Sequence, residues 1–248
     1  MILAAGLGTR LRPLTNDCPK ALVEVNGKTL LEIAINRLSK AGFHEIVVNV
    51  HHFADQIIDF IESKDRFGIQ ITISDERDEL LETGGGIKKA APFLNGDKAF
   101  LVCNVDVISD INLSAMYHSH LKSGALATLA VRQRKTSRYL MFNHHNNLSG
   151  WKNIKTEETK IVRNSQKKLK ELAFSGIHII QPRIFQYIKQ EGRFSIIDAY
   201  LDLAKKHKIK AYTHNDGYWL DVGKHDQLER ASTLLTQNPP QSLGILNL

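Results

Sequence analysis

The sequence predicts an α/β fold built on a mostly parallel sheet that is flanked by helices. Three observations lead to this prediction. Short β-branched runs alternate with helix-spaced apolar runs through the first hundred residues. The run at 99–103 is apolar throughout, as in a central strand that is covered on both faces. Beyond residue 110 the expected strands are shorter and richer in turns, which indicates an antiparallel excursion before the sheet resumes. Strand–helix–strand units in series favour right-handed crossovers between parallel strands.

The individual elements are expected in the following order. Alternating or β-branched segments predict strands at 1–5, 45–50, 69–73, 99–103, 125–131, 139–142, 148–151, 172–180 and 209–213. Apolar residues three or four apart predict helices at 30–38, 55–61, 86–91, 184–188, 196–204 and 224–235. Because the sequence contains no linker, no low-complexity tract and no hexapeptide repeat, we expect a single domain over 1–248 without a β-helix.

The composition is that of an ordinary globular protein. The chain has 248 residues, 42% of them hydrophobic and 24% charged, which is enough for one sizeable core. No apolar run reaches the roughly 18–20 residues that span a bilayer, so membrane insertion is not expected. The apolar start runs into Gly, Arg and Pro and not into a cleavage site, so a signal peptide is not expected either. Two cysteines, Cys18 and Cys103, favour reduced thiols and a cytoplasmic location.

The net charge of +7 does not indicate a nucleic-acid-binding protein. Many of the cations lie in the stretches 152–170 and 205–210, where they alternate with polar residues as on a solvated surface. A basic stripe interleaved with aromatic residues is absent from the sequence. Nothing in the sequence specifies an oligomeric state.

The first twenty residues carry the strongest functional signal. An apolar run breaks into the turn Gly6-Leu7-Gly8-Thr9-Arg10, and the cations Arg10, Arg12 and Lys20 flank this turn. A strand that leads into a glycine-bearing turn can bring backbone amides close to a phosphate, and the cations favour a polyanion such as a nucleoside triphosphate. The turn is neither a dinucleotide fingerprint nor a Walker A loop. A glycine pair after a strand is, however, also common in α/β proteins without a phosphate site.

Two aspartates follow apolar segments that are expected at the same edge of the sheet. Asp106 lies shortly after the strand at 99–103, and Asp221 follows the pair Trp219-Leu220. Ligands of open α/β sheets bind at the carboxyl ends of the strands, and a carboxylate there can hold a hard cation. The alternative for Asp106 is a residue that caps the next turn. The pair His51-His52 has no carboxylate at metal-ligand spacing, which favours a structural or surface role.

A third glycine-rich segment, Leu81 to Ile87, contains three consecutive glycines. Glycines are costly in backbone entropy, so three in a row predict a surface on which a base or a sugar lies against the backbone. A flexible loop is the alternative.

The motif A-A-G-x-G-T-R-L-x-P-L-T, followed by P-K-x-L, closely resembles the sugar-1-phosphate nucleotidyltransferases, also called NDP-sugar pyrophosphorylases. The resemblance covers roughly residues 1–235. It implies a Rossmann-like nucleotide-diphospho-sugar transferase fold with a mixed, mostly parallel sheet. It also implies the transfer of a nucleotidyl group from an NTP to a sugar 1-phosphate, with release of pyrophosphate. Members of the family usually begin slightly before the position of Met1.

The resemblance assigns roles to individual residues. Arg10 and Lys20 match the cations that contact the triphosphate, and Asp106 and Asp221 match the two aspartates that hold a catalytic Mg²⁺. Position 105 is Val where many relatives have Gly. The residues implied for nucleotide binding are Ala4, Ala5, Gly6, Gly8, Thr9, Arg10, Lys20, Thr83, Gly84 and Gly85.

On the sugar-phosphate side the resemblance implies Asn104, Lys152 and Gly176. Lys152 occupies roughly the place of the family's E-K-P motif but lacks the flanking Glu and Pro. Gly176 belongs to a segment similar to the family's F-S/T-G-I motif. His178, at the end of this segment, is either a substrate contact or a buried strand histidine.

The substrate is indicated only by the glycine loop. The sequence L-x-T-G-G-G-I is similar to the loop of nucleotidyltransferases that act on N-acetylmuramic acid 1-phosphate and of some mannose-1-phosphate guanylyltransferases, so these two activities are favoured. Alternatives are cytidylyl or uridylyl transfer to a non-sugar phosphate, and a non-catalytic regulatory homologue that binds nucleotide sugars. The presence of Arg10, Lys20 and both aspartates argues against the second alternative, and an oxidoreductase is disfavoured because no dinucleotide fingerprint follows any strand.

Overall fold

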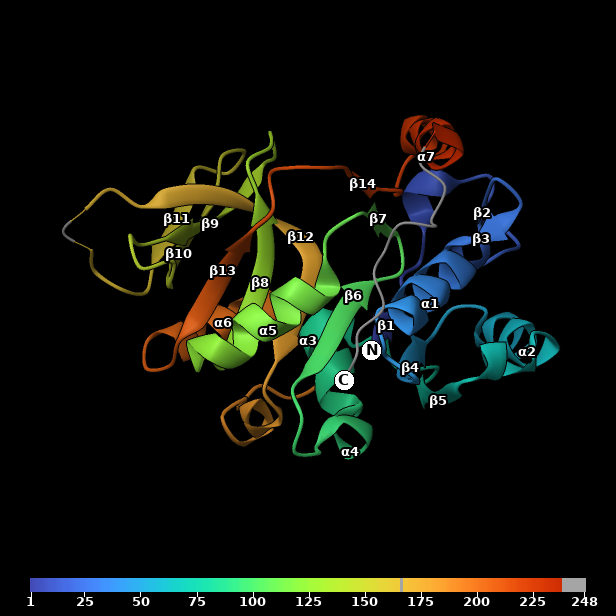
Figure 1. Ribbon diagram of the computed structural model, residues 1–248, viewed down its shortest axis with the longest axis horizontal. Coiled ribbons are helices and arrows are strands. Elements are labelled where there is room, and N and C mark those ends of the chain that lie inside the picture. Colours follow the sequence, from blue (N-terminus) through green and yellow to red (C-terminus); the bar gives the residue numbers. More distant parts are fainter. Residues whose placement is uncertain (166, 238–248) are drawn as a thin grey trace. The chain divides into compact units, whose positions relative to one another are not determined.

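The computed structural model describes residues 1–165 and 167–237. The chain forms two compact units (Figure 1). The first unit contains residues 1–82, 103–114 and the segment from Gly217 onward, and the second contains residues 83–102 and 115–216. No helix in the described ranges is long and apolar enough to cross a membrane.

The first unit contains a parallel sheet in the order β6-β1-β4-β5. Its strands are β1 (Ile2–Leu3), β4 (Glu45–Val50), β5 (Gln70–Asp75) and the end of β6 (Phe100–Asn104). Two antiparallel pairs accompany the sheet: β2 (Glu24–Val25) with β3 (Lys28–Thr29), and β7 (Val107–Ser109) with β14 (Trp219–Asp221). The helices of this unit are α1 (Leu30–Lys40), α2 (Ala54–Ser63), α7 (His225–Gln237) and the short 3-10 helices η1 (Thr9–Leu11), η2 (Lys20–Leu22) and η3 (Asp65–Gly68).

Apolar residues explain why the parallel strands of the first unit assemble. Ile2, Ile46 and Val48 are almost fully buried, and Ile2 lies opposite Val48 on one side and Cys103 on the other. Helix α1 begins where the Thr29 side chain accepts a hydrogen bond from the Glu32 amide at 3.0 Å, which caps the helix. The buried core therefore brings the carboxyl ends of β1, β4 and β6 to one edge.

The second unit contains a mainly antiparallel set of strands in the order β11-β10-β9-β12-β8-β13, in which only β13 and β8 are parallel. The strands are β8 (Ala127–Arg132), β9 (Arg138–Phe142), β10 (Leu148–Asn153), β11 (Glu158–Ile161), β12 (Lys170–Ile180) and β13 (Ile209–Thr213). The helices are α4 (Ala91–Leu94), α6 (Ile196–Ala204), the 3-10 helix η4 (Pro182–Gln186), and all but the first residues of α3 (Glu82–Lys89) and α5 (Leu113–Ser123).

The predicted α/β architecture is confirmed, including the antiparallel excursion after residue 110. Several elements differ from the prediction. The helix expected from Gly86 begins at Glu82, and the segment expected as a helix at 184–188 is η4. The helix α5 and the short strands β2, β3, β7, β11 and β14 were not predicted. All four residues of β11 are exposed, so its sequence has no apolar alternation. The single domain over 1–248 stays a prediction.

Close packing inside the second unit explains the glycine at position 84 of α3. Gly84, Gly85 and Gly86 are buried, and the amides of Gly84 and Gly85 donate to the carbonyl oxygen of Phe194 at 2.9 and 3.3 Å. A Cβ atom on Gly84 would lie 2.3 Å from the Phe194 ring. At position 84, therefore, the missing side chain makes room for Phe194, which differs from the open surface for a base or sugar that the sequence suggested.

We predict that Gly84→Ala destabilises the protein. Alanine normally stabilises a helix relative to glycine by up to about 1 kcal/mol, but the overlap with Phe194 should cost about 1–3 kcal/mol, so the net change is a loss. Denaturant unfolding measures this change. The control is Gly96→Ala, because a Cβ atom there meets no atom within 4 Å. Equal or higher stability of Gly84→Ala would contradict the packing explanation.

Candidate active site

The opening turn is shaped by a glycine at position 8. Gly8 has φ +64°, a backbone conformation that favours glycine, and its carbonyl oxygen accepts a hydrogen bond from the Thr15 hydroxyl at 2.9 Å. A Cβ atom on Gly8 would lie 3.0 Å from both Lys20 Cβ and Thr15 Cγ2. The loop from Gly8 to Lys20 therefore folds back on itself, and only glycine allows Lys20 to pack so closely.

The same turn offers backbone amides to a ligand. Within the described part of the chain, the amides of Gly6, Leu7 and Gly8 donate no hydrogen bond. Gly6 is exposed, and nothing lies within 4 Å of a Cβ atom built on it. The amide of Ala4, in contrast, donates to Asn49 Oδ1 at 2.7 Å and is not available. Unused amides in a turn form an anion-binding concavity, so Gly6 to Gly8 fit a phosphate.

Lys20 and Asp106 form an ion pair beside this turn. Each side chain is only 12% exposed, so both charges are largely withdrawn from water. Asp106 follows β6, and the intervening Val105 is buried and donates its amide to Leu3 O at 3.1 Å. Valine at position 105 is therefore part of the core beneath the site. Asn104, the last residue of β6, is half-buried.

The second aspartate reaches Asp106 through the antiparallel pair β7 and β14. Asp221 lies opposite Val107 in this pair, and the Val222 amide donates to the carbonyl oxygen of Asp106 at 2.8 Å. These backbone contacts join two segments that are far apart in the chain. The sequence did not indicate this strand pair, although it placed both aspartates at the site.

Asp221 lies in an environment that disfavours its charge. Its Oδ1 atom is buried and has no hydrogen-bond partner among the described residues. Burial raises the pKa of Asp221, and the neighbouring Asp106 raises this pKa further, while Lys20 and Arg10 oppose the increase. The Asp221 carboxylate therefore has one oxygen without a hydrogen-bond partner, and an additional positive charge nearby would stabilise its ionised form.

Arg10 completes the cluster because Gly223 leaves room for it. A Cβ atom on Gly223 would lie 2.6 Å from Arg10 Nη2 and 2.7 Å from Asp221 Oδ1. Arg10, Lys20, Asp106 and Asp221, which the sequence predicted as the catalytic set, thus lie together in the first unit. We refer to these four residues as the charged cluster.

The charged cluster fits a Mg²⁺ ion better than a structural metal. The described residues contain no group of three or more His, Cys, Asp or Glu side chains that could hold a metal. The charged cluster contains two carboxylates, those of Asp106 and Asp221. Structural zinc sites use four protein ligands, whereas Mg²⁺ is usually held by one or two carboxylates and completes its shell with water and phosphate oxygens. The unpartnered Oδ1 of Asp221 is an oxygen of the required kind.

The remaining predicted residues lie in the second unit. Thr83, Gly84 and Gly85 belong to α3, where the Thr83 hydroxyl accepts a hydrogen bond from the Ile196 amide at 3.0 Å. Lys152 forms a half-exposed ion pair with Glu171 at 3.1 Å. Their roles toward nucleotide and sugar phosphate stay predictions.

Gly176 and His178 lie where the register of β12 against β8 shifts. Gly176 has φ +72°, which explains the glycine. His178 is fully buried, its Nδ1 lies 2.5 Å from the Tyr200 hydroxyl, and burial lowers its pKa to about 3. Of the two interpretations of His178, the structure therefore favours the buried strand histidine.

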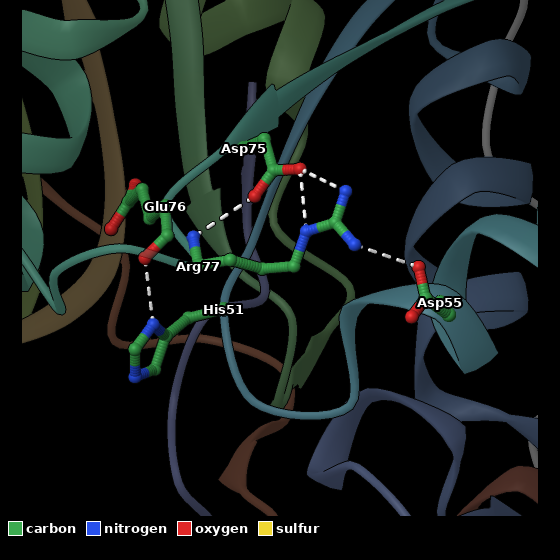
Figure 2. Close-up of polar contacts among 5 residues, drawn as sticks. All are labelled: His51, Asp55, Asp75, Glu76 and Arg77. Atoms are coloured by element: carbon green, nitrogen blue, oxygen red, sulfur yellow. Dashed lines mark hydrogen bonds and ion pairs between the residues drawn. The ribbon is translucent and has the colours of Figure 1, made fainter.

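Sequence reasoning missed two buried polar residues behind the opening turn, Asn49 and Glu76. Asn49 Nδ2 donates to Glu76 Oε1 at 2.7 Å. His51 contacts the Glu76 carbonyl oxygen through Nδ1 at 2.7 Å, which gives this histidine a structural role (Figure 2). The available signal was a polar residue inside the otherwise apolar strand 46–50.

The sequence model of the family described as "Nucleotidyl transferase" matches residues 1–238. The chain belongs to the nucleotidyl transferase family. The resemblance of the first twenty residues to this family is thereby confirmed.

Two curated relatives and one solved structure illustrate this membership. N-acetylmuramate alpha-1-phosphate uridylyltransferase of Neisseria meningitidis is 34% identical, with 94% of this chain and 96% of the relative covered. The protein with the same name from Caulobacter vibrioides is 35% identical, with 90% of each chain covered. UDP-glucose pyrophosphorylase from Acinetobacter baumannii superimposes with a TM-score of 0.78 at 18% identity, covering 98% of this chain and 94% of that one. The last comparison shows a shared fold.

We predict that Asp221→Asn raises the melting temperature in metal-free buffer at pH 7. The substitution removes a buried carboxylate that lies next to Asp106, and each kcal/mol gained corresponds to about 2–4 °C for a chain of this size. Because the pKa of Asp221 is higher in the folded than in the unfolded chain, wild-type stability rises as acidification protonates this group. The difference between variant and wild type should therefore shrink as the pH falls.

Thermal unfolding at several pH values measures this effect, with Asp59→Asn as the control. Asp59 is an exposed aspartate on α2, so its substitution should change little. A lower melting temperature of Asp221→Asn at pH 7, or a difference that does not depend on pH, would contradict the description of the charged cluster.

Proposed function

We propose that this protein transfers a nucleotidyl group from a nucleoside triphosphate to a sugar 1-phosphate and releases pyrophosphate. The observation that carries the proposal is the charged cluster beside unused backbone amides. The first unit contains groups that the reaction needs. They are two carboxylates that can hold a divalent cation, the positively charged side chains of Arg10 and Lys20, and the amides of Gly6 to Gly8. The family to which the chain belongs supports the same reaction.

The reaction is an in-line displacement at phosphorus. A phosphate oxygen of the sugar 1-phosphate attacks the α-phosphorus of the triphosphate, a new P–O bond forms, and the bond to the bridging α,β-oxygen breaks. Pyrophosphate leaves with the electron pair of that bond. The attacking oxygen is ionised near neutral pH, so the reaction needs no general base. The barrier comes from repulsion between two anions and from their alignment, which positioning and charge can lower.

The residues of the first unit meet these requirements. Arg10 and Lys20 can hold the β- and γ-phosphates and stabilise the charge that develops on pyrophosphate. Asp106 and Asp221 would hold Mg²⁺, which when bound neutralises phosphate charge. The ion pair with Asp106 keeps Lys20 close to the site before the nucleotide arrives.

Two observations support N-acetylmuramate 1-phosphate and UTP as the substrates. The relatives from Neisseria and Caulobacter carry that activity in their names, and each matches this chain over at least 90% of both sequences. The segment Leu81 to Ile87 has the sequence L-x-T-G-G-G-I, which is similar to the loop of such enzymes. The same loop also resembles some mannose-1-phosphate guanylyltransferases, so GTP with mannose 1-phosphate is the second pair to test.

The test is a pyrophosphate-release panel of four NTPs against several sugar 1-phosphates in the presence of Mg²⁺. We expect the highest kcat/KM for UTP with N-acetylmuramate 1-phosphate. A higher value for GTP with mannose 1-phosphate would change the substrate assignment but not the reaction class. Turnover of a non-sugar phosphate alone, or no turnover at all, would contradict the proposal.

The same assay tests the roles of the two aspartates. Asp106→Asn and Asp221→Asn should each reduce kcat at least about 100-fold, because a misplaced or missing cation removes much of the charge stabilisation. Asp59→Asn, which makes the same chemical change at an exposed site, should keep wild-type kcat. Near-normal turnover in either active-site variant would remove that residue from the proposed metal site.

A further inference from the structure

A chain of buried hydrogen bonds runs behind the opening turn in the first unit. The Ala4 amide donates to Asn49 Oδ1 at 2.7 Å, and Asn49 Nδ2 donates to Glu76 Oε1 at 2.7 Å. The other carboxylate oxygen of Glu76 accepts the Leu81 amide at 3.4 Å. Asn49 is 2% exposed and Glu76 is fully buried. We refer to these contacts as the Asn49–Glu76 network.

The chemistry of the partners fixes the direction of every bond in the network. A backbone amide can only donate, so the atom of Asn49 that faces Ala4 must be the oxygen, and its nitrogen must face Glu76. Glu76 therefore meets donors on both sides, the Asn49 amide group and the Leu81 amide. A carboxylate has acceptors on both oxygens and satisfies both donors.

The backbone of Glu76 is held as firmly as its side chain. Its amide donates to Val50 O at 2.8 Å, and its carbonyl oxygen contacts His51 Nδ1 at 2.7 Å. Figure 2 shows that the neighbouring Asp75 points to Arg77, which in turn reaches Asp55. Two consecutive carboxylates thus have different surroundings, Glu76 in the interior and Asp75 at the surface.

The position of the network indicates what it does. Burying a carboxylate is unfavourable compared with burying an apolar side chain of similar volume, so stability alone does not account for Glu76. The network ends on Ala4, two residues before Gly6 in the turn whose amides at Gly6 to Gly8 are unused. We propose that Asn49 and Glu76 are positioning residues that hold Ala4 and thereby orient the opening turn for the triphosphate. This inference rests on the proposed function, since it assigns the turn to the nucleotide.

Exchanging the two side-chain types tests the proposal. In Glu76→Gln the side chain has one acceptor for two donors, and in Asn49→Asp two carboxylates face each other. The double variant Asn49→Asp/Glu76→Gln reverses the direction of the hydrogen bond between the side chains at positions 49 and 76. Asp at position 49 still accepts from Ala4, Gln at position 76 donates to its second oxygen, and the remaining Gln oxygen accepts from Leu81. All three hydrogen bonds and the single buried charge are restored.

We expect each single variant to raise the KM for UTP or GTP about tenfold, which corresponds to roughly 1.4 kcal/mol. The kcat and the KM for the sugar 1-phosphate should stay within about twofold of wild type, since neither Asn49 nor Glu76 is among the residues predicted to hold the metal or the sugar phosphate. The double variant should return the NTP KM to within about threefold of wild type. Asp75→Asn, the same chemical change as Glu76→Gln one residue away, should leave all three constants unchanged.

Two results would overturn the proposal. One is an unchanged NTP KM in both single variants. The other is a proportional change of kcat and both KM values that follows the melting temperature and is not reversed in the double variant, because this is what a purely structural network would produce.

The failure of the proposed function can be told apart from the failure of this inference. If wild-type protein turns over no sugar 1-phosphate, the proposed function fails, and the same variants are compared by calorimetric binding of UTP and GTP with Mg²⁺. A Kd that weakens in the single variants and recovers in the double variant still supports the network. Equal Kd values in all variants, or no nucleotide binding by wild type, overturn it.

Discussion

The candidate site depends on one unfavourable arrangement, the two carboxylates of Asp106 and Asp221 held next to each other in partly buried surroundings. Left alone, the two charges would repel, and burial together with this repulsion raises the pKa of Asp221. The fold prevents their separation because the β7–β14 pair and the Val222 amide tie the two backbone segments together. Lys20 and Arg10 reduce the repulsion without removing it. Such a site gains the most electrostatic stabilisation when a divalent cation and phosphate groups bind together.

Other residues of the first unit also fix the positions of the groups at the site. Glycines at 8 and 223 leave room for Lys20 and Arg10, so that the cations can lie against the turn and against Asp221. Asn49 and Glu76 hold the amide of Ala4 from behind. The Ala4 amide is therefore not available to a ligand. The amides of Gly6, Leu7 and Gly8, which donate no hydrogen bond in the described chain, remain available.

The parts that sequence could predict are those with a local signature. The β-branched run at 45–50 and the apolar spacing at 30–38 match β4 and α1 because a strand and an amphipathic helix each show their own period. The sequence predicted Arg10, Lys20, Asp106 and Asp221 together because the motifs that contain them resemble those of a known family. The β7–β14 pair was missed because it forms between distant short segments that have no pattern of their own. Glu76 was missed because its burial is decided by Asn49 and Leu81, which its local sequence does not reveal.

The glycines of α3 show where a local rule misleads. Three glycines in a row weaken a helix, so the sequence favoured a loop or an open ligand surface before Ile87, yet α3 contains all three. Packing against Phe194 outweighs the intrinsic preference at Gly84. At Gly84, therefore, the glycine leaves room for a side chain of the same unit, which the sequence alone does not identify.

We propose that Asp106 and Asp221 together form one divalent-cation site. The most direct test is the binding of Mn²⁺, which accepts the same oxygen ligands as Mg²⁺, followed by electron paramagnetic resonance. We predict one Mn²⁺ per wild-type chain and an affinity at least about tenfold weaker in both Asp106→Asn and Asp221→Asn, each of which removes one of only two carboxylate ligands. Mn²⁺ binding that is equal in wild type and in both variants would show that these two aspartates do not hold the cation.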